Sequence, residues 1–190
     1  MSISSLLKLL PSRKSYGVPP APSWIKINTD GASITNPLRA VAAGIFRNSE
    51  GACIGGFSQF LGYGNALFAE LYVAMTTIEL AASNGFTNIW LESDSQLVIQ
   101  AFKSKSIVPW GLKNRWDNCI GIIQGLNFCA SHIYREGNVC ADSRANFGLS
   151  LASLDLFGLI SSLPLLGEST LGIGWECLAL DSSPFEKVLV

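Results

Sequence analysis

The hydrophobic residues of this chain follow two different periods, and the order of the two periods is the strongest constraint on its fold. From Trp24 to Asp30, apolar and polar residues alternate, which is typical of a half-buried β-strand. Two further apolar runs, Arg39 to Phe46 and Ala52 to Phe60, flank the turn-forming residues 48–51 and so predict a hairpin. We therefore expect three antiparallel strands at the start of the domain.

After these strands the chain changes to helical periodicity. Asn65 is a common helix-capping residue, and the apolar residues that follow it recur at helical spacing until Gly85. The elements expected beyond this helix are, in order, a strand at 88–92, a helix at 95–102, a helix at 112–126, a strand at 128–134 and a helix capped by Asn138. Strands that are connected through helices pair in parallel, so the sequence predicts an α/β fold.

Four acidic residues occupy related positions in these elements. Asp30 ends the first strand and Asp94 follows the fourth strand. Glu70 lies early in the first helix, and Asp142 lies in the last helix. Ligand sites of sheets with parallel strands collect at the carboxyl ends of those strands, so Asp30 and Asp94 face one crevice if their strands are parallel neighbours. Each acid also has an ordinary explanation, as a turn former, a first-turn helix residue, a helix cap or a solvated helix residue.

If the four acids converge, they need a bound cation. Two carboxylates about 5 Å apart repel by roughly 3 kcal/mol at an effective dielectric constant of about 20, so four cannot all stay ionised without a counter-charge. No paired histidine or cysteine lies near them in the sequence. Hard oxygen ligands select Mg²⁺ or Mn²⁺ over zinc.

The composition is that of one globular domain without a basic surface. The chain has 190 residues, of which 48% are hydrophobic and 14% charged, with a net charge of -1 and a pI near 5.8. Proteins that coat nucleic acid by bulk charge are strongly basic, so any nucleic-acid contact must be local. The five cysteines lack paired zinc-binding or redox spacings, which favours reduced thiols in an intracellular protein, nuclear or cytoplasmic. Localisation to an organelle is the alternative, because residues 1–29 are basic and contain no acidic residue, as in a targeting segment.

Four sequence blocks resemble the signature blocks of the ribonuclease H family. They are, in chain order, NTDGA at 28–32, AELYVA at 69–74, ESDS at 92–95 and REGNVCAD at 135–142. The resemblance is closest to the reverse-transcriptase-associated branch that derives from plant retrotransposons, and it covers Trp24 to Leu151. No single block is specific, whereas four blocks in this order and at this spacing are.

The resemblance implies a ribonuclease H-like fold with a mixed five-stranded sheet, its strands one to three antiparallel, flanked by helices. It also implies that the metal-binding, catalytic carboxylates are Asp30, Glu70, Asp94 and Asp142. In that family two Mg²⁺ ions bracket the scissile phosphate of the RNA strand in an RNA/DNA hybrid, and the strand is cleaved by in-line displacement. Five further residues of the blocks are expected near the substrate, namely Gly31, Ala32, Ser95, Arg135 and Asn138.

The segments on both sides of the resembling region have different compositions. Four prolines between residues 11 and 23 make residues 1–23 a linker or a targeting-like segment. The tail, residues 152–190, is rich in Leu, Ser and Gly, and Asp155 and Pro164 interrupt its most apolar part. We therefore expect a monomer with no membrane span, in which a surface helix or a loosely packed extension follows the domain of residues 24–151.

The chain departs from the best-characterised relatives where they carry a long basic handle. Its shorter segment contains Lys103, Lys105, Lys113 and Arg115, with Trp110 and Trp116 among them. This segment is either a surface that grips phosphate and stacks on bases, or a solvated loop with two core tryptophans.

Two more residues have alternative roles. His132 lies ten residues before Asp142, where relatives often have a proton-shuttling histidine. Its predicted strand position also fits a residue that makes a local hydrogen bond, so both roles stay open. Arg144 stands where relatives usually have a leucine, and it either contacts phosphate or disturbs the packing of its helix.

Two functions are consistent with these observations. The first is a metal-dependent endoribonuclease that hydrolyses the RNA strand of RNA/DNA hybrids with two Mg²⁺ ions, Mn²⁺ being able to replace them. The second is a non-catalytic, domesticated module that binds nucleic acid or a protein partner, which the acidic balance and the missing handle favour. Turnover of a hybrid, or binding without turnover, separates the two.

Overall fold

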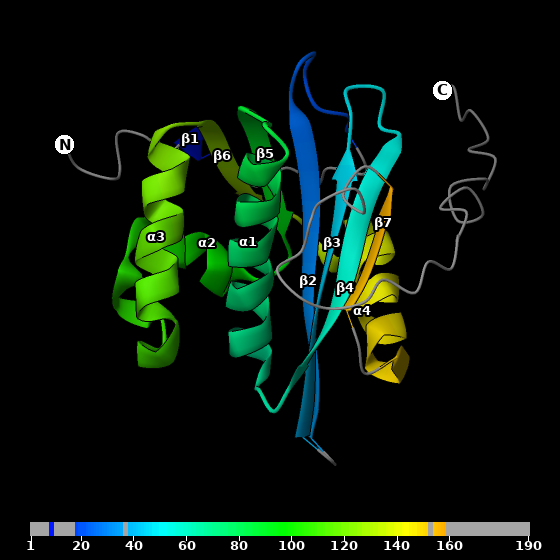
Figure 1. The fold of residues 1–190 in the computed structure, drawn as a ribbon, viewed down its shortest axis with the longest axis vertical. Coiled ribbons are helices and arrows are strands. Elements are labelled where there is room, and N and C mark those ends of the chain that lie inside the picture. The colour runs from blue at the N-terminus through cyan, green and yellow to red at the C-terminus, as the bar shows by residue number, and fades with distance from the viewer. Residues whose placement is uncertain (1–7, 10–17, 36–37, 152–153, 159–190) are drawn as a thin grey trace, which may run out of the picture.

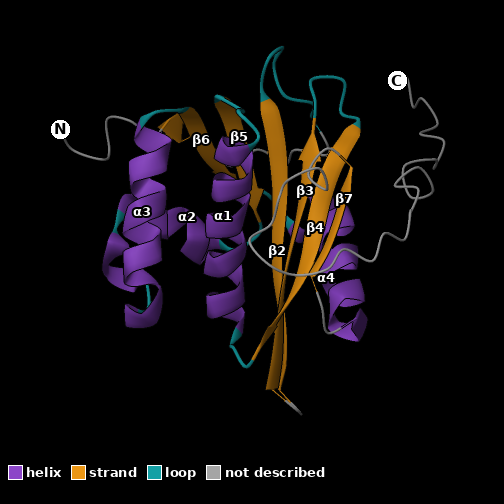
Figure 2. Ribbon diagram, in the orientation of Figure 1, coloured by secondary structure: helices purple, strands orange, loops and turns teal. Residues whose placement is uncertain are grey.

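The chain folds into one mixed β-sheet with helices on both faces, as a computed structural model shows for residues 8–9, 18–35, 38–151 and 154–158 (Figures 1 and 2). The strands are β1 (Lys8–Leu9), β2 (Ile25–Thr35), β3 (Leu38–Arg47), β4 (Cys53–Gly62), β5 (Asn88–Ser93), β6 (Asn127–His132) and β7 (Leu154–Gly158). The helices are α1 (Ala66–Ser83), α2 (Gln96–Lys103), α3 (Lys113–Gln124) and α4 (Val139–Leu151), with the short 3-10 turns η2 (Lys105–Ile107), η3 (Trp110–Leu112) and η4 (Arg135–Gly137).

The five central strands have the directions that the sequence predicts. The sheet order is β1-β6-β5-β2-β3-β4-β7. β2, β3 and β4 pair antiparallel, and β5 and β6 run parallel to β2. The predicted mixed sheet is therefore confirmed, and β2 and β5 are the parallel neighbours that the argument about a shared crevice requires.

β2 is longer than its sequence pattern indicates. The prediction that Asp30 ends this strand is wrong, because the strand continues to Thr35 and pairs with β3 along its whole length. Small residues at 31–33 interrupt the apolar alternation, whereas backbone pairing with β3 continues through them. Asp30 therefore lies in the middle of a strand.

Two short strands extend the central sheet at its edges. β1 pairs parallel with β6, and β7 pairs antiparallel with β4. The expectation of a surface helix or a loose extension after the domain is wrong for Leu154–Gly158, which form the paired strand β7. Added edge strands satisfy backbone groups that would otherwise be open to pairing with another chain.

α1 begins and ends where the sequence predicts. The side chain of Asn65 accepts the backbone N–H of Phe68 at 2.8 Å and so caps the helix. Gly85 has a φ of 74°, and beyond it the N–H of Phe86 bonds to the carbonyl of Ala81, which closes the C-terminal end. Both signals were local in sequence, which is why they could be recognised.

The helices lie in two layers (Figure 1). α1, α2 and α3 cover one face of the sheet, and α4 covers the other. The main core lies under the first layer and includes Ile27 and Leu91 from the sheet, Leu71 and Ile78 from α1, and Trp116 from α3. α1 has the length and hydropathy of a membrane-spanning helix, but half of that window is buried inside the protein. Packing in the core accounts for its apolar composition.

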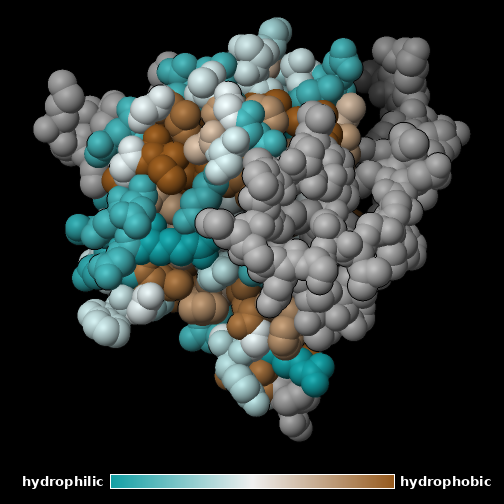
Figure 3. Space-filling model, in the orientation of Figure 1, coloured by the Kyte–Doolittle hydropathy of each residue, from teal (hydrophilic) through white to brown (hydrophobic). Residues whose placement is uncertain are grey.

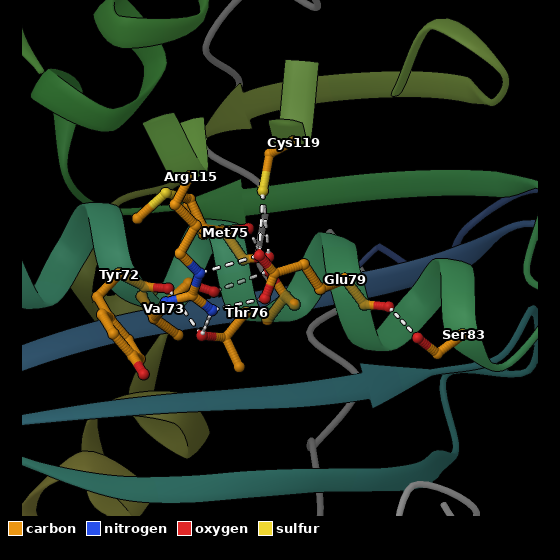
Figure 4. A network of polar contacts seen from close by, with 10 residues as sticks. Tyr72, Val73, Met75, Thr76, Glu79, Ser83, Arg115 and Cys119 are labelled. Atoms are coloured by element: carbon orange, nitrogen blue, oxygen red, sulfur yellow. Dashed lines mark hydrogen bonds and ion pairs between the residues drawn. The ribbon is translucent and has the colours of Figure 1, made fainter. Parts of the chain in front are cut away.

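A polar network joins α1 to α3 (Figure 4). The Arg115 guanidinium donates to both carboxylate oxygens of Glu79, at 2.9 and 2.6 Å, and to Thr76 Oγ1 at 2.8 Å. It also lies over the Tyr72 ring, 4.2 Å from the ring centroid. Burial, together with the neighbouring Glu79, raises the pKa of the Cys119 thiol to about 12, so this thiol stays protonated. In the space-filling view, hydrophilic residues gather around the middle of α3 (Figure 3).

A buried ion pair joins β2 to β5. Lys26 Nζ lies 2.6 Å from Glu92 Oε2, and the two side chains are 3% and 1% exposed. Asn28 donates to the same oxygen at 3.2 Å, and Lys26 lies 4.5 Å from the centroid of the Trp90 ring. This carboxylate is therefore neutralised and hydrogen-bonded by residues of the chain itself.

Candidate metal centre

Three carboxylates from three elements meet beside the centre of the sheet. Thr29 of β2 pairs with Ser93 of β5 in the parallel ladder. Asp30 is the next residue of β2, and Asp94 directly follows the end of β5, so the two lie side by side. Glu70 reaches them from α1, and one ligand oxygen of each acid lies within 4.8 Å of those of the other two. Asp30 and Asp94 therefore lie together, as the parallel pairing of their strands predicts.

Gly31 determines how closely α1 approaches β2. A Cβ atom at this position would lie 2.3 Å from the backbone nitrogen of Glu70, far inside any contact distance. α1 therefore packs directly on the strand backbone, which brings Glu70 beside Asp30. The backbone N–H of Gly31 also donates a hydrogen bond to the Glu70 carboxylate. Gly31, which the sequence placed near the substrate, lies buried beneath α1.

The pKa values of the three carboxyls are all raised. Burial, with the charges of Asp94 and Asp142 beside it, raises the pKa of Asp30 from 3.8 to about 7. Burial and the charges of Asp30 and Asp94 raise the pKa of Glu70 from 4.5 to about 9. Burial also raises the pKa of Asp94. At neutral pH the group therefore retains protons, which relieves the repulsion between adjacent carboxylates.

The donor set of this group fits a divalent cation. Its donors are carboxylate oxygens, the ligands that Mg²⁺ and Mn²⁺ prefer. Oε2 of Glu70 is buried and has no hydrogen-bond partner among the described residues. An unpaired buried carboxylate oxygen is costly, and a cation would satisfy it and replace the retained protons.

Asp142, the fourth predicted acid, lies at the edge of the group. It is in the first turn of α4, and its charge helps to raise the pKa of Asp30 and of Asp94. Its Oδ1 accepts a hydrogen bond from Arg135 at 3.1 Å, and its Oδ2 accepts one from Asn146 at 3.2 Å. The structure thus brings Asp142 close to the other three acids but bonds both of its oxygens to neighbouring side chains.

Asn138 connects α4 to the acid group. Its side chain is buried, and its Nδ2 donates to the backbone carbonyl of Thr29 at 2.9 Å and, at the long distance of 3.5 Å, to Asp94 Oδ1. Asn138 precedes α4 as predicted, but its Oδ1 has no hydrogen-bond partner among the described residues, so the prediction that its side chain caps the helix is wrong. Its Nδ2 instead contacts β2 and a carboxylate, a role that sequence reasoning missed. No local pattern marks this contact, because Thr29 lies 109 residues away. The sequence block at 135–142 places Asn138 close to Asp142 along the chain, but it does not predict the contact with Thr29.

His132 is the last residue of β6, which confirms its predicted strand position. Its Nε2 lies 3.1 Å from the backbone carbonyl of Asp94, to which it donates. The imidazole also makes an edge contact with Tyr134. These are the local contacts expected of a structural histidine, and the role in proton transfer stays a prediction.

The other residues that the sequence placed near the substrate lie at the margins of the group. Ala32 packs beneath α4, against the small cluster of Val41, Ala43 and Ala145. Ser95 occupies the N-cap position of α2, but its side chain makes no capping hydrogen bond. Arg144 lies in α4, and its side chain is outside the described residues.

The basic segment that runs from the end of α2 into α3 contains both paired and solvent-facing residues. Arg115 belongs to the network with α1, and Lys105 lies 3.3 Å from Asp117. Trp116 is buried in the core, whereas Trp110 is 90% exposed. The interpretation of two core tryptophans is therefore wrong for Trp110, which presents an aromatic face to solvent.

The strand order, the helices on both faces and the acid group between β2 and β5 define a ribonuclease H-like α/β domain. The structure is similar to that of RNase H1 from Halobacterium salinarum, with a TM-score of 0.61 and 26% identity over 68% of this chain and 99% of that chain. It is also similar to LC11-RNase H1, which was isolated from compost and solved in complex with an RNA/DNA hybrid. For that structure the TM-score is 0.59 and the identity 22%, over 67% of this chain and 98% of that chain.

The chain belongs to the reverse transcriptase-like family, whose sequence model matches residues 28–148. It is also similar to the "Putative ribonuclease H protein" of Arabidopsis thaliana, with 36% identity over 160 residues. That alignment covers 82% of this chain but 26% of the relative, so the chain spans about a quarter of the relative's length. The resemblance to the ribonuclease H family and the predicted fold class are both confirmed.

Proposed function

We propose that this domain is a metal-dependent endoribonuclease that hydrolyses the RNA strand of RNA/DNA hybrids. The observation that carries the proposal is the meeting of Asp30, Glu70 and Asp94 within 4.8 Å, with raised pKa values and a buried oxygen that lacks a partner. A structural role does not require three neighbouring acids that cannot all ionise. A nuclease of this family requires them as metal ligands.

In this proposal four acids hold two Mg²⁺ or Mn²⁺ ions. Asp30, Glu70 and Asp94 supply the converging oxygens, and Asp142 completes the set from α4. When bound, the two ions would activate a water molecule and stabilise the leaving 3′ oxygen. The chain itself fixes the ligands: Gly31 allows Glu70 to approach Asp30, and the residues of the parallel ladder align Asp30 with Asp94.

The substrate of this proposal is an RNA/DNA hybrid, recognised through the 2′-hydroxyls of its wide, shallow minor groove. The support is the sequence relative named for ribonuclease H and the hybrid-bound structure of LC11-RNase H1. Because the net charge is -1, phosphate contacts must be local, and the exposed Trp110 with Lys103 and Lys113 is the local surface we propose. Trp110→Ala should raise the KM for a hybrid about tenfold, since stacking contributes roughly 1–3 kcal/mol per base, while kcat is retained. An unchanged KM in steady-state kinetics would exclude this contact.

The decisive experiment is cleavage of a labelled hybrid in Mg²⁺ by the purified chain and three variants. Asp30→Asn and Asp94→Asn should abolish cleavage, because each removes a charged ligand without changing the side-chain volume. Asp117→Asn removes an exposed acid that pairs with Lys105, and it should cleave like the wild type. Cleavage that survives Asp30→Asn and Asp94→Asn would mean that the metal centre is elsewhere.

The alternative is a non-catalytic module that binds nucleic acid or a protein partner. It is favoured by one observation, the bonding of both Asp142 oxygens to side chains of the chain. In that case the protein would bind a hybrid without turnover at every Mg²⁺ and Mn²⁺ concentration tested. An intracellular monomer without a membrane span is proposed for either function.

A further inference from the structure

The four proposed ligands are not equally available to a cation. One oxygen each of Asp30, Glu70 and Asp94 lies within 4.8 Å of the others. Asp142, by contrast, accepts hydrogen bonds at both oxygens, and the donor to Oδ1 is the positively charged side chain of Arg135. The chain therefore already places a cation at the one ligand that a second metal ion would have to recruit.

Arg135 acts on the whole acid group and not on Asp142 alone. Its charge lowers the pKa of Asp30, Glu70 and Asp94, which opposes the effect of their burial. The residue belongs to η4, a single 3-10 turn between β6 and α4, and its side chain is 77% exposed. A side chain in such a position can leave Asp142 without any rearrangement of the core.

We propose that Arg135 competes with the second metal ion for Asp142. The positive charge of Arg135 beside Oδ1 repels a divalent ion at Asp142, so the ion binds more weakly while Arg135 stays there, and binding of the ion favours release of Arg135. The released guanidinium is then free to bind a phosphate oxygen of the substrate, for which its planar set of donors is suited. Binding of substrate and binding of the second ion would thereby favour one another. This inference rests on the proposed two-metal function.

The competition predicts a larger effect on the metal site that contains Asp142 than on the other site. Removing one positive charge from the edge of a solvent-exposed site should strengthen binding of a divalent ion there by about three- to tenfold. The ion held by Asp30, Glu70 and Asp94 does not need Asp142, so its affinity should change by less than about twofold.

The test is a calorimetric Mn²⁺ titration of the full chain, prepared metal-free, without substrate. In Arg135→Gln the weaker of two Mn²⁺ sites should tighten about three- to tenfold, whereas Arg135→Lys, which keeps the charge, should resemble the wild type. Arg39→Gln removes the same charge from an exposed position of β3 and serves as the matched control, with both affinities unchanged. Thermal unfolding in EDTA verifies that the variants fold equally.

The outcomes separate this inference from the proposed function. A wild type that binds two Mn²⁺ ions, together with an Arg135→Gln variant whose weaker site is unchanged or weakened, would overturn the competition and leave the two-metal function intact. A wild type that binds no Mn²⁺ would overturn both. Selective tightening of the weaker site in Arg135→Gln, absent in Arg39→Gln, supports the competition.

Discussion

Carboxylates of this protein occur in two kinds of surroundings. Glu79 and Glu92 are each neutralised within the chain, by Arg115 on α3 and by Lys26 on β2. Glu70 and its neighbours Asp30 and Asp94 face one another, and Oε2 of Glu70 has no partner among the described residues. The paired acids stabilise contacts between elements. The converging acids repel one another in the metal-free fold, and the proposed cation would offset that repulsion.

The strongest test of this comparison removes a converging acid. Glu70→Gln keeps the volume and removes the charge, so we expect hybrid cleavage to fall on the order of a thousandfold, which corresponds to several kcal/mol of lost stabilisation by the ions. The metal-free variant should unfold at the same temperature as the wild type or higher. Cleavage in Mg²⁺ and thermal unfolding in EDTA measure the two effects. Lower stability of Glu70→Gln in EDTA would mean that Glu70, like the paired acids Glu79 and Glu92, stabilises the fold.

The opposite result is expected when a paired acid loses its partner. Lys26→Met leaves Glu92 buried without a counter-charge, which should lower the free energy of unfolding by about 3–5 kcal/mol. The double variant with Glu92→Met should recover most of that loss, because neither charge then remains buried. Urea unfolding measures both. A Lys26→Met variant as stable as the wild type would show that the ion pair contributes nothing.

The pH dependence of the metal-free protein should reveal the converging acids. Folding raises the pKa of Asp30 to about 7 and that of Glu70 to about 9, so the folded state binds more protons than the unfolded chain above about pH 4. Stability contributed by these protons is complete at low pH and is lost as the pH rises through 7 and 9. The unfolding temperature in EDTA should therefore fall between pH 5 and pH 9 by several degrees.

Two additions sharpen the pH experiment. Asp30→Asn should flatten the profile near pH 7, because the titrating group is gone. Mg²⁺ added at pH 9 should restore stability to the wild type, since the ion replaces the lost protons. A wild-type unfolding temperature that rises across this pH range would contradict the raised pKa values.

The smallest effect is expected at the network between α1 and α3. Arg115→Met removes a pair whose side chains are 28% and 36% exposed, so solvent screening limits the expected loss to about 1 kcal/mol. Hybrid cleavage per folded molecule should not change. A large loss of cleavage would show that this network, and not the close contact at Gly31, positions α1 for catalysis.

The parts of this fold that could be predicted are those with local signals. The ends of α1 are marked by Asn65 and Gly85, and hydrogen bonds at both ends confirm them. The end of β2 was mispredicted because Gly31 and the small residues after it lack apolar alternation, and only pairing with β3 keeps them in the strand. Strand β7 was missed for a similar reason, since its partner β4 is remote in sequence.

In the candidate site, too, the features with local sequence signals could be predicted and those that depend on tertiary contacts could not. Its four acids could be named from their blocks, and three of them converge as expected. The bonding of Asp142 to Arg135, and the reach of Asn138 to Thr29, depend on the tertiary arrangement and have no sequence signature. The two tryptophans of the basic segment are equally apolar, so only packing could assign Trp116 to the core and Trp110 to solvent.

The direct contact between α1 and the backbone at Gly31 has a consequence for how the site is built. Asp30 lies on β2 and Glu70 on α1, and at Gly31 the helix rests directly on the backbone of the strand, with no room for a side chain between them. The spacing of their backbones is thus set by the packing of α1 on β2. A larger side chain at position 31 would therefore move the Glu70 backbone away from Asp30, whereas rotamer changes shift only the carboxylate oxygens between backbones of fixed spacing.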